Sequence, residues 1–255
     1  RGLAHYRASE FREALADFQD AIRKKPNHPA AYIRSAMARQ ALGQHAEAIA
    51  DLDQAEALGS TETRVYFLRA ANREALGDKA AASRERAAGL AREPSDEASY
   101  LFRGYARIAS DPQAALADFD KALERNPNSE VALQNKSHLL SEKLGRTAEA
   151  VAVIEQLARL SPDQAIHRAD HGVLIARLGR HEEALRDAED CARRSPSPDV
   201  LYRVGCIHAL TAGTNEQRKR EAVRLLATAV RQGFGGDLLA IDHDSEYMRG
   251  FVNFH

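Results

Sequence analysis

The feature that most constrains this sequence is a phrase that occurs twice. Residues 14–27 read ALADFQDAIRKKPN, and residues 115–128 read ALADFDKALERNPN. Prolines that follow a polar run keep the same rhythm, at intervals of 68, 33, 35 and 34 residues: Pro26, Pro94, Pro127, Pro162 and Pro196. The first interval is twice 34, and Ser60 stands at its midpoint. A period of this length indicates a repeat architecture in which each unit is one small structural element.

Alanine marks the same period, and each marker begins a short apolar pattern. An aromatic or aliphatic residue follows four positions later in most units, and a small residue three positions after that, as in Ala14–Phe18–Ala21. Spacings of three and four place these side chains on one face of a helix. The marker residues are Ala14, Ala48, Ala82, Ala115, Ala150, Ala184 and Ala222.

Each unit is predicted to be a pair of helices. In the second unit the first helix runs from Pro29 to about Leu42, and the second runs from about Ala46 to Leu58. The turn between them is LGQHAEA, in which Gly43 suits the left-handed conformation that ends many helices. Similar turns occur at 76–82, 144–150 and 178–184. A proline after the second helix stops it. The sequence therefore predicts an all-α fold.

This pattern resembles the tetratricopeptide repeat, a 34-residue helical hairpin. The best matches to its signature are Tyr32–Ala48–Leu52–Ala55 and Tyr100–Gly104–Ala115–Phe119–Ala122–Pro127, and the resemblance covers roughly residues 1–233. It implies a right-handed superhelical solenoid of about six complete repeats and a truncated first one, with repeats ending near 26, 60, 94, 127, 162, 196 and 233. Residues 234–255 are predicted to be a capping segment with a short helix near 237–241, because a repeat array must cover its last apolar stripe.

Three units depart from the common length. The fourth is one residue shorter than the others, at SDPQAA (110–115), and the fifth is one residue longer, near SEKLG (141–145). The seventh carries extra residues at 211–220, which predicts longer helices. The first unit resembles a repeat cut in its first helix, so we expect further protein before Arg1.

Composition narrows the possible functions. There are 36 basic and 37 acidic residues, whereas a nucleic-acid-binding domain normally carries a basic surplus. The longest apolar runs, such as VAVI at 151–154 and LLAI at 238–241, are far too short to cross a bilayer. Two cysteines, Cys191 and Cys206, can build neither a disulfide framework nor a closed zinc site, and they are expected to be buried close to each other at a repeat junction. These features predict a cytoplasmic protein that binds neither nucleic acid nor membrane.

A search for catalytic or metal-binding patterns predicts no enzyme activity, no metal and no cofactor. HRAD at 167–170 resembles part of a kinase catalytic loop but lies within a predicted helix and lacks the accompanying motifs. His167 and His171 share a helical face, yet no third ligand is identifiable. DHDSE at 242–246 has Tyr247 where a calcium loop needs glycine, so we interpret it as a polar turn that caps a helix.

The resemblance instead places a binding site on the first helices of the repeats, whose inner faces form a concave groove in this family. A peptide or partner protein is the expected ligand, since aromatic residues and Met are enriched in such interfaces. The carboxylate clamp of some family members is not expected, because Ile33, Met37 and Leu68 occupy its places. The predicted groove residues are Ile33, Met37, Gln40, Arg64, Phe67, Glu74, Leu101, Tyr105, Ile108, Gln134 and His138.

The sequence thus predicts a scaffold for protein–protein interaction. Its last residues resemble the tail that follows such repeats in large bacterial signalling proteins, and the third and fourth units resemble repeats that follow a bacterial Ser/Thr kinase domain. We therefore expect the non-catalytic region of such a protein. The alternative is a solenoid that presents substrate to a catalytic domain, a kinase or transferase, located before Arg1. The identity of the partner and the oligomeric state stay open.

Overall fold

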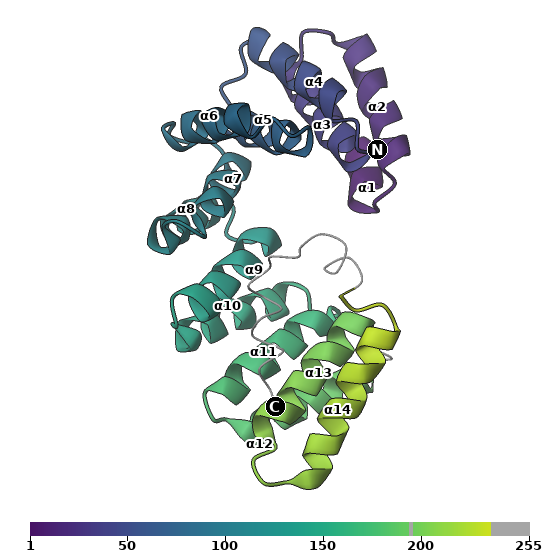
Figure 1. Cartoon of the computed structure of the whole chain (residues 1–255), viewed down its shortest axis with the longest axis vertical. Helices are drawn as coiled ribbons and strands as arrows, with labels where there is room; N and C mark the ends of the chain where they lie inside the picture. The colour runs from purple at the N-terminus through teal and green to yellow at the C-terminus, as the bar shows by residue number, and fades with distance from the viewer. Residues whose placement is uncertain (194–195, 236–255) are drawn as a thin grey trace. The chain divides into compact units, whose positions relative to one another are not determined.

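The computed structural model describes residues 1–193 and 196–235 (Figure 1). These residues form α-helices and turns and contain no strand, which confirms the all-α prediction. The chain divides after Ala132 into two compact units. The helices are α1 (Gly2–Arg7), α2 (Phe11–Lys24), α3 (Pro29–Ala41), α4 (His45–Ala57), α5 (Arg64–Ala75), α6 (Lys79–Leu90), α7 (Glu97–Arg107), α8 (Pro112–Arg125), α9 (Glu130–His138), η1 (Leu139–Lys143), α10 (Thr147–Leu160), α11 (Ala165–Arg177), α12 (His181–Ala192), α13 (Pro198–Thr211) and α14 (Glu216–Arg231).

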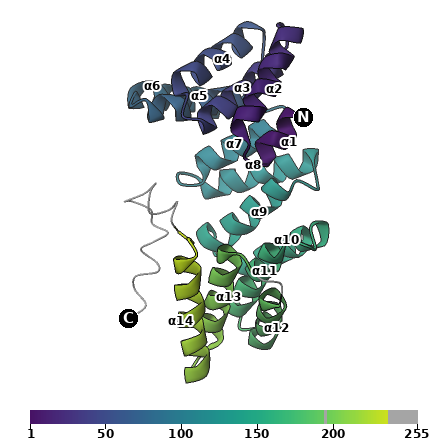
Figure 2. The same cartoon turned by 90° about the vertical axis from the view of Figure 1, so that its right-hand side faces the viewer.

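Within each unit the helices pair as antiparallel hairpins that stack on one another (Figures 1 and 2). In the first unit α1 packs on α2, α3 on α4, α5 on α6 and α7 on α8. In the second unit the π-helical turn η1 packs on α10, α11 on α12 and α13 on α14. Five second helices also contact the first helix of the following hairpin: α2 with α3, α4 with α5, α6 with α7, α10 with α11 and α12 with α13. This is the helical-repeat arrangement that the period predicts.

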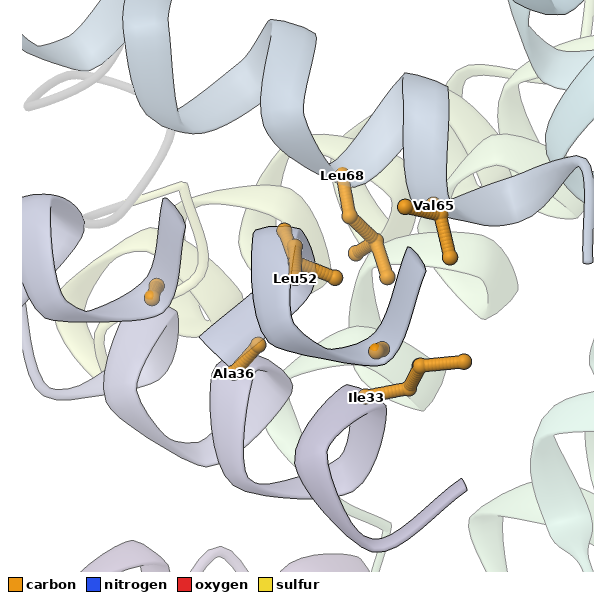
Figure 3. Packing of buried hydrophobic residues seen from close by; sticks show 7 residues of the cluster. Ile33, Ala36, Leu52, Val65 and Leu68 are labelled. Carbon is orange, nitrogen blue, oxygen red and sulfur yellow. The ribbon is translucent and has the colours of Figure 1, made fainter. Parts of the chain in front are cut away.

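The core of the first unit shows why one hairpin cannot cover its own apolar stripe. A cluster of buried side chains joins α3, α4 and α5 (Figure 3): Ile33, Ala36, Ala48, Leu52, Ala55, Val65 and Leu68. The marker alanine Ala48 and the small residue Ala55 are fully buried and bring the helices close together. The apolar stripe of the α3–α4 hairpin is completed by Val65 and Leu68 from the next hairpin, so stability depends on neighbours.

Glycine closes most of the turns inside the hairpins. Gly43 has a φ of 74° and Gly77 a φ of 82°, in the left-handed region that favours glycine. The first repeat has Ser9 at the place that Gly43 occupies in the second repeat, and its φ is 60°. The fourth repeat, which is one residue shorter than the others, uses a different turn. The Asp111 side chain accepts a hydrogen bond from the Ala114 amide, 3.0 Å away, and caps α8.

A π-helical turn accommodates the extra residue of the fifth repeat. η1 continues directly from α9, and the Leu144 amide donates to the Leu139 carbonyl five residues earlier, at 3.1 Å. A π-turn holds one more residue than an α-turn at little change in helix direction. The insertion therefore leaves Leu139 and Leu140 buried and leaves the following turn, at Gly145, in the usual left-handed conformation.

The seventh repeat has long helices, as predicted. α13 has 14 residues and α14 has 16, which makes α14 the longest described helix. Asn215 caps α14 by accepting a bond from the Arg218 amide at 3.0 Å. Phe234 folds back and stacks on Tyr202 of α13, with 4.0 Å between the ring centroids. The predicted capping segment, including the helix near 237–241 and the acidic stretch 242–246, lies outside the described residues.

Candidate peptide-binding face

The predicted groove residues lie on first helices, in two groups that belong to different units. Nine are in the first unit, on α3, α5 and α7, with Ile108 directly after α7. Gln134 and His138 are on the part of α9 that belongs to the second unit, and both are exposed. The two groups are therefore described separately.

Three predicted groove residues are core residues instead. Ile33 has no exposed surface, and Phe67 and Leu101 are 7% and 9% exposed. Ile33 belongs to the core cluster of α3, α4 and α5. Phe67 faces Gly89 of α6 so closely that a Cβ on this glycine would lie 2.9 Å from the Phe67 Cζ. These three side chains stand at the same place in successive repeats, where neighbouring helices cover them.

A second row, one turn further along the same helices, reaches the surface. Met37, Ala71 and Tyr105 are spaced 34 residues apart on α3, α5 and α7, and α5 contacts both of the other helices. Tyr105 is 43% exposed, and its ring meets Phe119 edge-on at 5.8 Å, which fixes its orientation. Met37 is half-buried against the core cluster, as is Phe102 of α7. Ala71 is not evident from the sequence, because an exposed alanine carries no binding pattern.

The polar residues predicted for the groove already have partners within the first unit. The buried amide of Asn72 donates to Gln40 Oε1 at 3.1 Å, and Asn72 Oδ1 lies 2.9 Å from Nδ1 of His45. Glu74 forms an ion pair with Arg86 at 2.6 Å, and Arg64 pairs with Glu62. The apolar surface of this face therefore comes mainly from the second row and from Ile108, which is half-buried.

Buried cations hold neighbouring hairpins together beside this face. Arg69 of α5 binds Glu85 of α6 at 3.2 Å and also Asp53 and Glu56 of α4, at 2.8 and 2.6 Å. Burial by itself lowers the pKa of Arg69, but hydrogen bonds to Asp53 and Glu56 outweigh this effect and the pKa is raised. The guanidinium therefore stays charged and bridges three helices.

The same bridge recurs at the equivalent place in later repeats. Arg103 of α7 binds Asp118 of α8 at 2.7 Å and Glu93, after α6, at 2.7 Å. In the second unit His171 of α11 lies 2.6 Å from Asp187 of α12 and 3.7 Å from Glu155 of α10. Sequence reasoning missed these bridges, although a cation followed 15 or 16 residues later by a carboxylate was a readable signal.

The structure places the histidine and cysteine patterns within helices. HRAD lies inside α11, and His171 is used in the interhelical bridge. Among residues 1–193 and 196–235 no group of three potential ligands could hold a metal ion. Cys191 is buried, Cys206 is half-buried, and burial raises the pKa of the Cys206 thiol, which disfavours the reactive thiolate.

The inner face of the second unit is charged rather than apolar. Arg177 of α11 pairs with Glu142 of η1, and Arg203 of α13 pairs with Asp170 of α11, so ion pairs link successive first helices. His138 and Gln134 precede η1 on α9.

Within the described ranges no helix is both long and apolar enough to span a membrane.

Comparison with known proteins agrees with this architecture. A family model described as tetratricopeptide repeat matches residues 1–62 and 141–198. No curated protein matches the sequence. Among solved structures, a tetratricopeptide repeat protein from Parabacteroides merdae is 20% identical and has a TM-score of 0.57, with 94% of this chain and 93% of that chain covered.

Two further solved structures share the fold over most of this chain. Human IFIT1, determined as a dimer with PPP-AAAA, is 16% identical with a TM-score of 0.61, and the match covers 87% of this chain. The Cut9–Hcn1 hetero-tetramer of the APC/C gives 19% identity, a TM-score of 0.56 and 90% coverage of this chain. This chain spans about half the length of IFIT1, 54%, and 41% of the Cut9–Hcn1 chain. The tetratricopeptide-repeat model thus matches residues 1–62 and 141–198, and the described chain has the fold of a tetratricopeptide-repeat protein.

Proposed function

We propose that this chain is a non-catalytic scaffold that binds a peptide or a segment of a partner protein on the first helices of its first unit. The observation that carries the proposal is the row Met37–Ala71–Tyr105. It places two large apolar side chains on either side of an exposed alanine. Peptide ligands gain most of their affinity from a few apolar anchors seated between such side chains.

The row also limits the kind of segment that fits. Ala71 leaves space between Met37 and Tyr105, so a large apolar side chain of the partner would sit over this alanine. Glu74 and Gln40 flank the row one turn further on, and each already has a partner within the chain. The partner is therefore a segment with a hydrophobic anchor, in an extended or a helical conformation.

An alanine-to-arginine substitution tests this face directly. Peptides selected from a random 12-residue display library against the full chain should share one large apolar residue, and Ala71→Arg should weaken their binding at least about tenfold, or 1.4 kcal/mol. Ala87→Arg on the exposed side of α6 is the matched control and should leave the affinity unchanged. Equal binding by both variants, with wild-type helicity by circular dichroism, would show that the peptides bind elsewhere.

The wider role proposed for this chain is the interaction region of a larger bacterial signalling protein, such as a Ser/Thr kinase. The support is the resemblance of its third and fourth repeats and of its last residues to such proteins. The alternative is a solenoid that presents substrate to a kinase or transferase domain. Reading the coding sequence upstream of Arg1 decides between them: a Gly-rich loop, a strand lysine and paired HRD and DFG motifs would identify a kinase.

A further inference from the structure

A buried amide network orients Gln40 beside the apolar row of the first unit. Gln40 stands three residues after Met37 on α3, and Asn72 directly follows Ala71 on α5. Asn72 has no exposed surface, and its Nδ2 donates to Gln40 Oε1 across the two helices at 3.1 Å. The Gln40 side chain therefore reaches from α3 toward α5, next to the alanine over which the proposed anchor sits.

A main-chain carbonyl fixes the direction of every hydrogen bond in this network. Nδ2 of Asn72 lies 2.8 Å from the carbonyl oxygen of Leu68, which can only accept, so this atom of Asn72 is the donor. The same nitrogen donates its second hydrogen to Gln40, so the Gln40 atom that it meets is the oxygen. Asn72 Oδ1 in turn accepts from Nδ1 of His45, 2.9 Å away. The orientation of the Gln40 amide therefore follows from the Leu68 carbonyl.

The unused part of Gln40 is a hydrogen-bond donor. Its Oε1 is engaged by Asn72, and its Nε2 has no hydrogen-bond partner among the residues that the structure describes. Gln40 is half-buried, so a ligand can reach the side chain. An amide nitrogen carries two N–H groups and cannot accept. Glu74, the equivalent residue of α5, is held by Arg86 at 2.6 Å. The face thus offers one oriented donor within a helical turn of the apolar row.

We infer that Gln40 Nε2 donates a hydrogen bond to a main-chain carbonyl of the bound segment and thereby selects an extended segment, an inference that rests on the proposed function of this face. The acceptor has to lie beside the anchor residue whatever the sequence of the segment, and every residue supplies a main-chain carbonyl. In a helical segment these carbonyls are already bonded, except for the last four. An extended segment has no internal hydrogen bonds, so its carbonyls are free.

Gln40→Glu in the full chain isolates the donor. Glutamate has nearly the same shape and keeps an oxygen for Asn72, but its carboxylate has no N–H. The probe is a peptide without net charge from the 12-residue library described above. Its binding should weaken at least about tenfold, while the thermal midpoint of the protein stays at the wild-type value. Gln54→Glu, at an exposed position of α4, adds the same charge and is the matched control, which should bind as the wild type does.

Variants of the peptide identify the acceptor. Replacing one main-chain carbonyl oxygen at a time by sulfur weakens a single acceptor and keeps every N–H group. One position beside the anchor should lose roughly three- to tenfold in affinity for the wild type and nothing further for Gln40→Glu. In NMR spectra of the bound, ¹³C-labelled peptide, the Cα resonances around the anchor should lie upfield of their random-coil positions, as they do in an extended backbone.

The two proposals fail in different ways. Full binding by Gln40→Glu together with loss of binding in Ala71→Arg would overturn the inference and leave the proposed function standing. Full binding by both variants would overturn both proposals. A sulfur substitution that costs the same affinity for the wild type and for Gln40→Glu, or Cα resonances shifted downfield as in a helix, would also contradict the inference.

Discussion

Ser9 is the single non-glycine residue with a left-handed backbone among the described residues, and it stands where other repeats have glycine. A side chain in this conformation costs on the order of 1–2 kcal/mol because Cβ approaches the neighbouring backbone. Ser9→Gly should therefore raise the free energy of unfolding by about 1 kcal/mol in a urea titration. The reciprocal change Gly43→Ser should lower it by a similar amount. A loss of stability in Ser9→Gly would mean that the serine side chain stabilises the turn.

His208 of α13 gives the second unit a pH-dependent stability. Burial lowers the pKa of its imidazole below the ordinary value near 6.5, and Nδ1 has no hydrogen-bond partner in the described part of the chain. The unfolded chain therefore binds a proton more readily than the folded one, so stability is full above pH 6.5 and falls as the pH drops below it.

The expected result is a smaller loss of thermal midpoint between pH 7.5 and pH 5.0 in His208→Gln than in the wild type. His181→Gln, at an exposed position on α12, is the matched control and should keep the wild-type pH dependence. Identical pH profiles for all three proteins would rule out His208 as the source.

At the scale of helices, the Arg103–Asp118 bridge between α7 and α8 is the most deeply buried ion pair described. Removing one partner leaves a buried charge without compensation, so Asp118→Ala should cost about 3–5 kcal/mol. The double variant R103L/D118L should lose less than Asp118→Ala alone, because both charges leave the interior together. Asp20→Ala, in an exposed pair on α2, should change little. Urea unfolding measures all three, and equal losses in the single and double variants would contradict the bridge.

The π-turn η1 predicts an unusual tolerance of a deletion. Removing Ser141 should convert η1 into an ordinary α-turn, because the fifth unit then has the common repeat length. We expect a cooperative thermal transition with helicity close to wild type by circular dichroism. Removing one residue from the middle of α10, for example Val153, rotates every later side chain by about 100° and should abolish the transition. If both deletions behave alike, η1 does not absorb the insertion.

At the scale of the whole molecule, the sequence predicted the helices well, but it placed three buried residues, Ile33, Phe67 and Leu101, among those expected to line a groove. The period fixed the hairpins because the same spacing recurs in every unit, and the helix ends fall within a few residues of the expected positions. It could not separate Ile33 from Met37, since both lie on inner faces and only the approach of neighbouring helices decides which is covered. The buried bridges at Arg69 and Arg103, by contrast, have a signal in the sequence, a carboxylate 16 or 15 residues after the arginine.

Three joints between hairpins carry polar contacts of different composition: the Asn72 amide network and the Arg69 bridge after α4, the Arg103 bridge after α6 and the His171 bridge after α10. A chain that repeats its own words, as at 14–27 and 115–128, risks pairing a helix with the wrong copy of its neighbour while it folds. A mispaired joint would bury Asn72 against a surface without Gln40 and His45, at a penalty of about 1–3 kcal/mol. The different composition of these polar contacts therefore favours the correct pairing among near-identical helices.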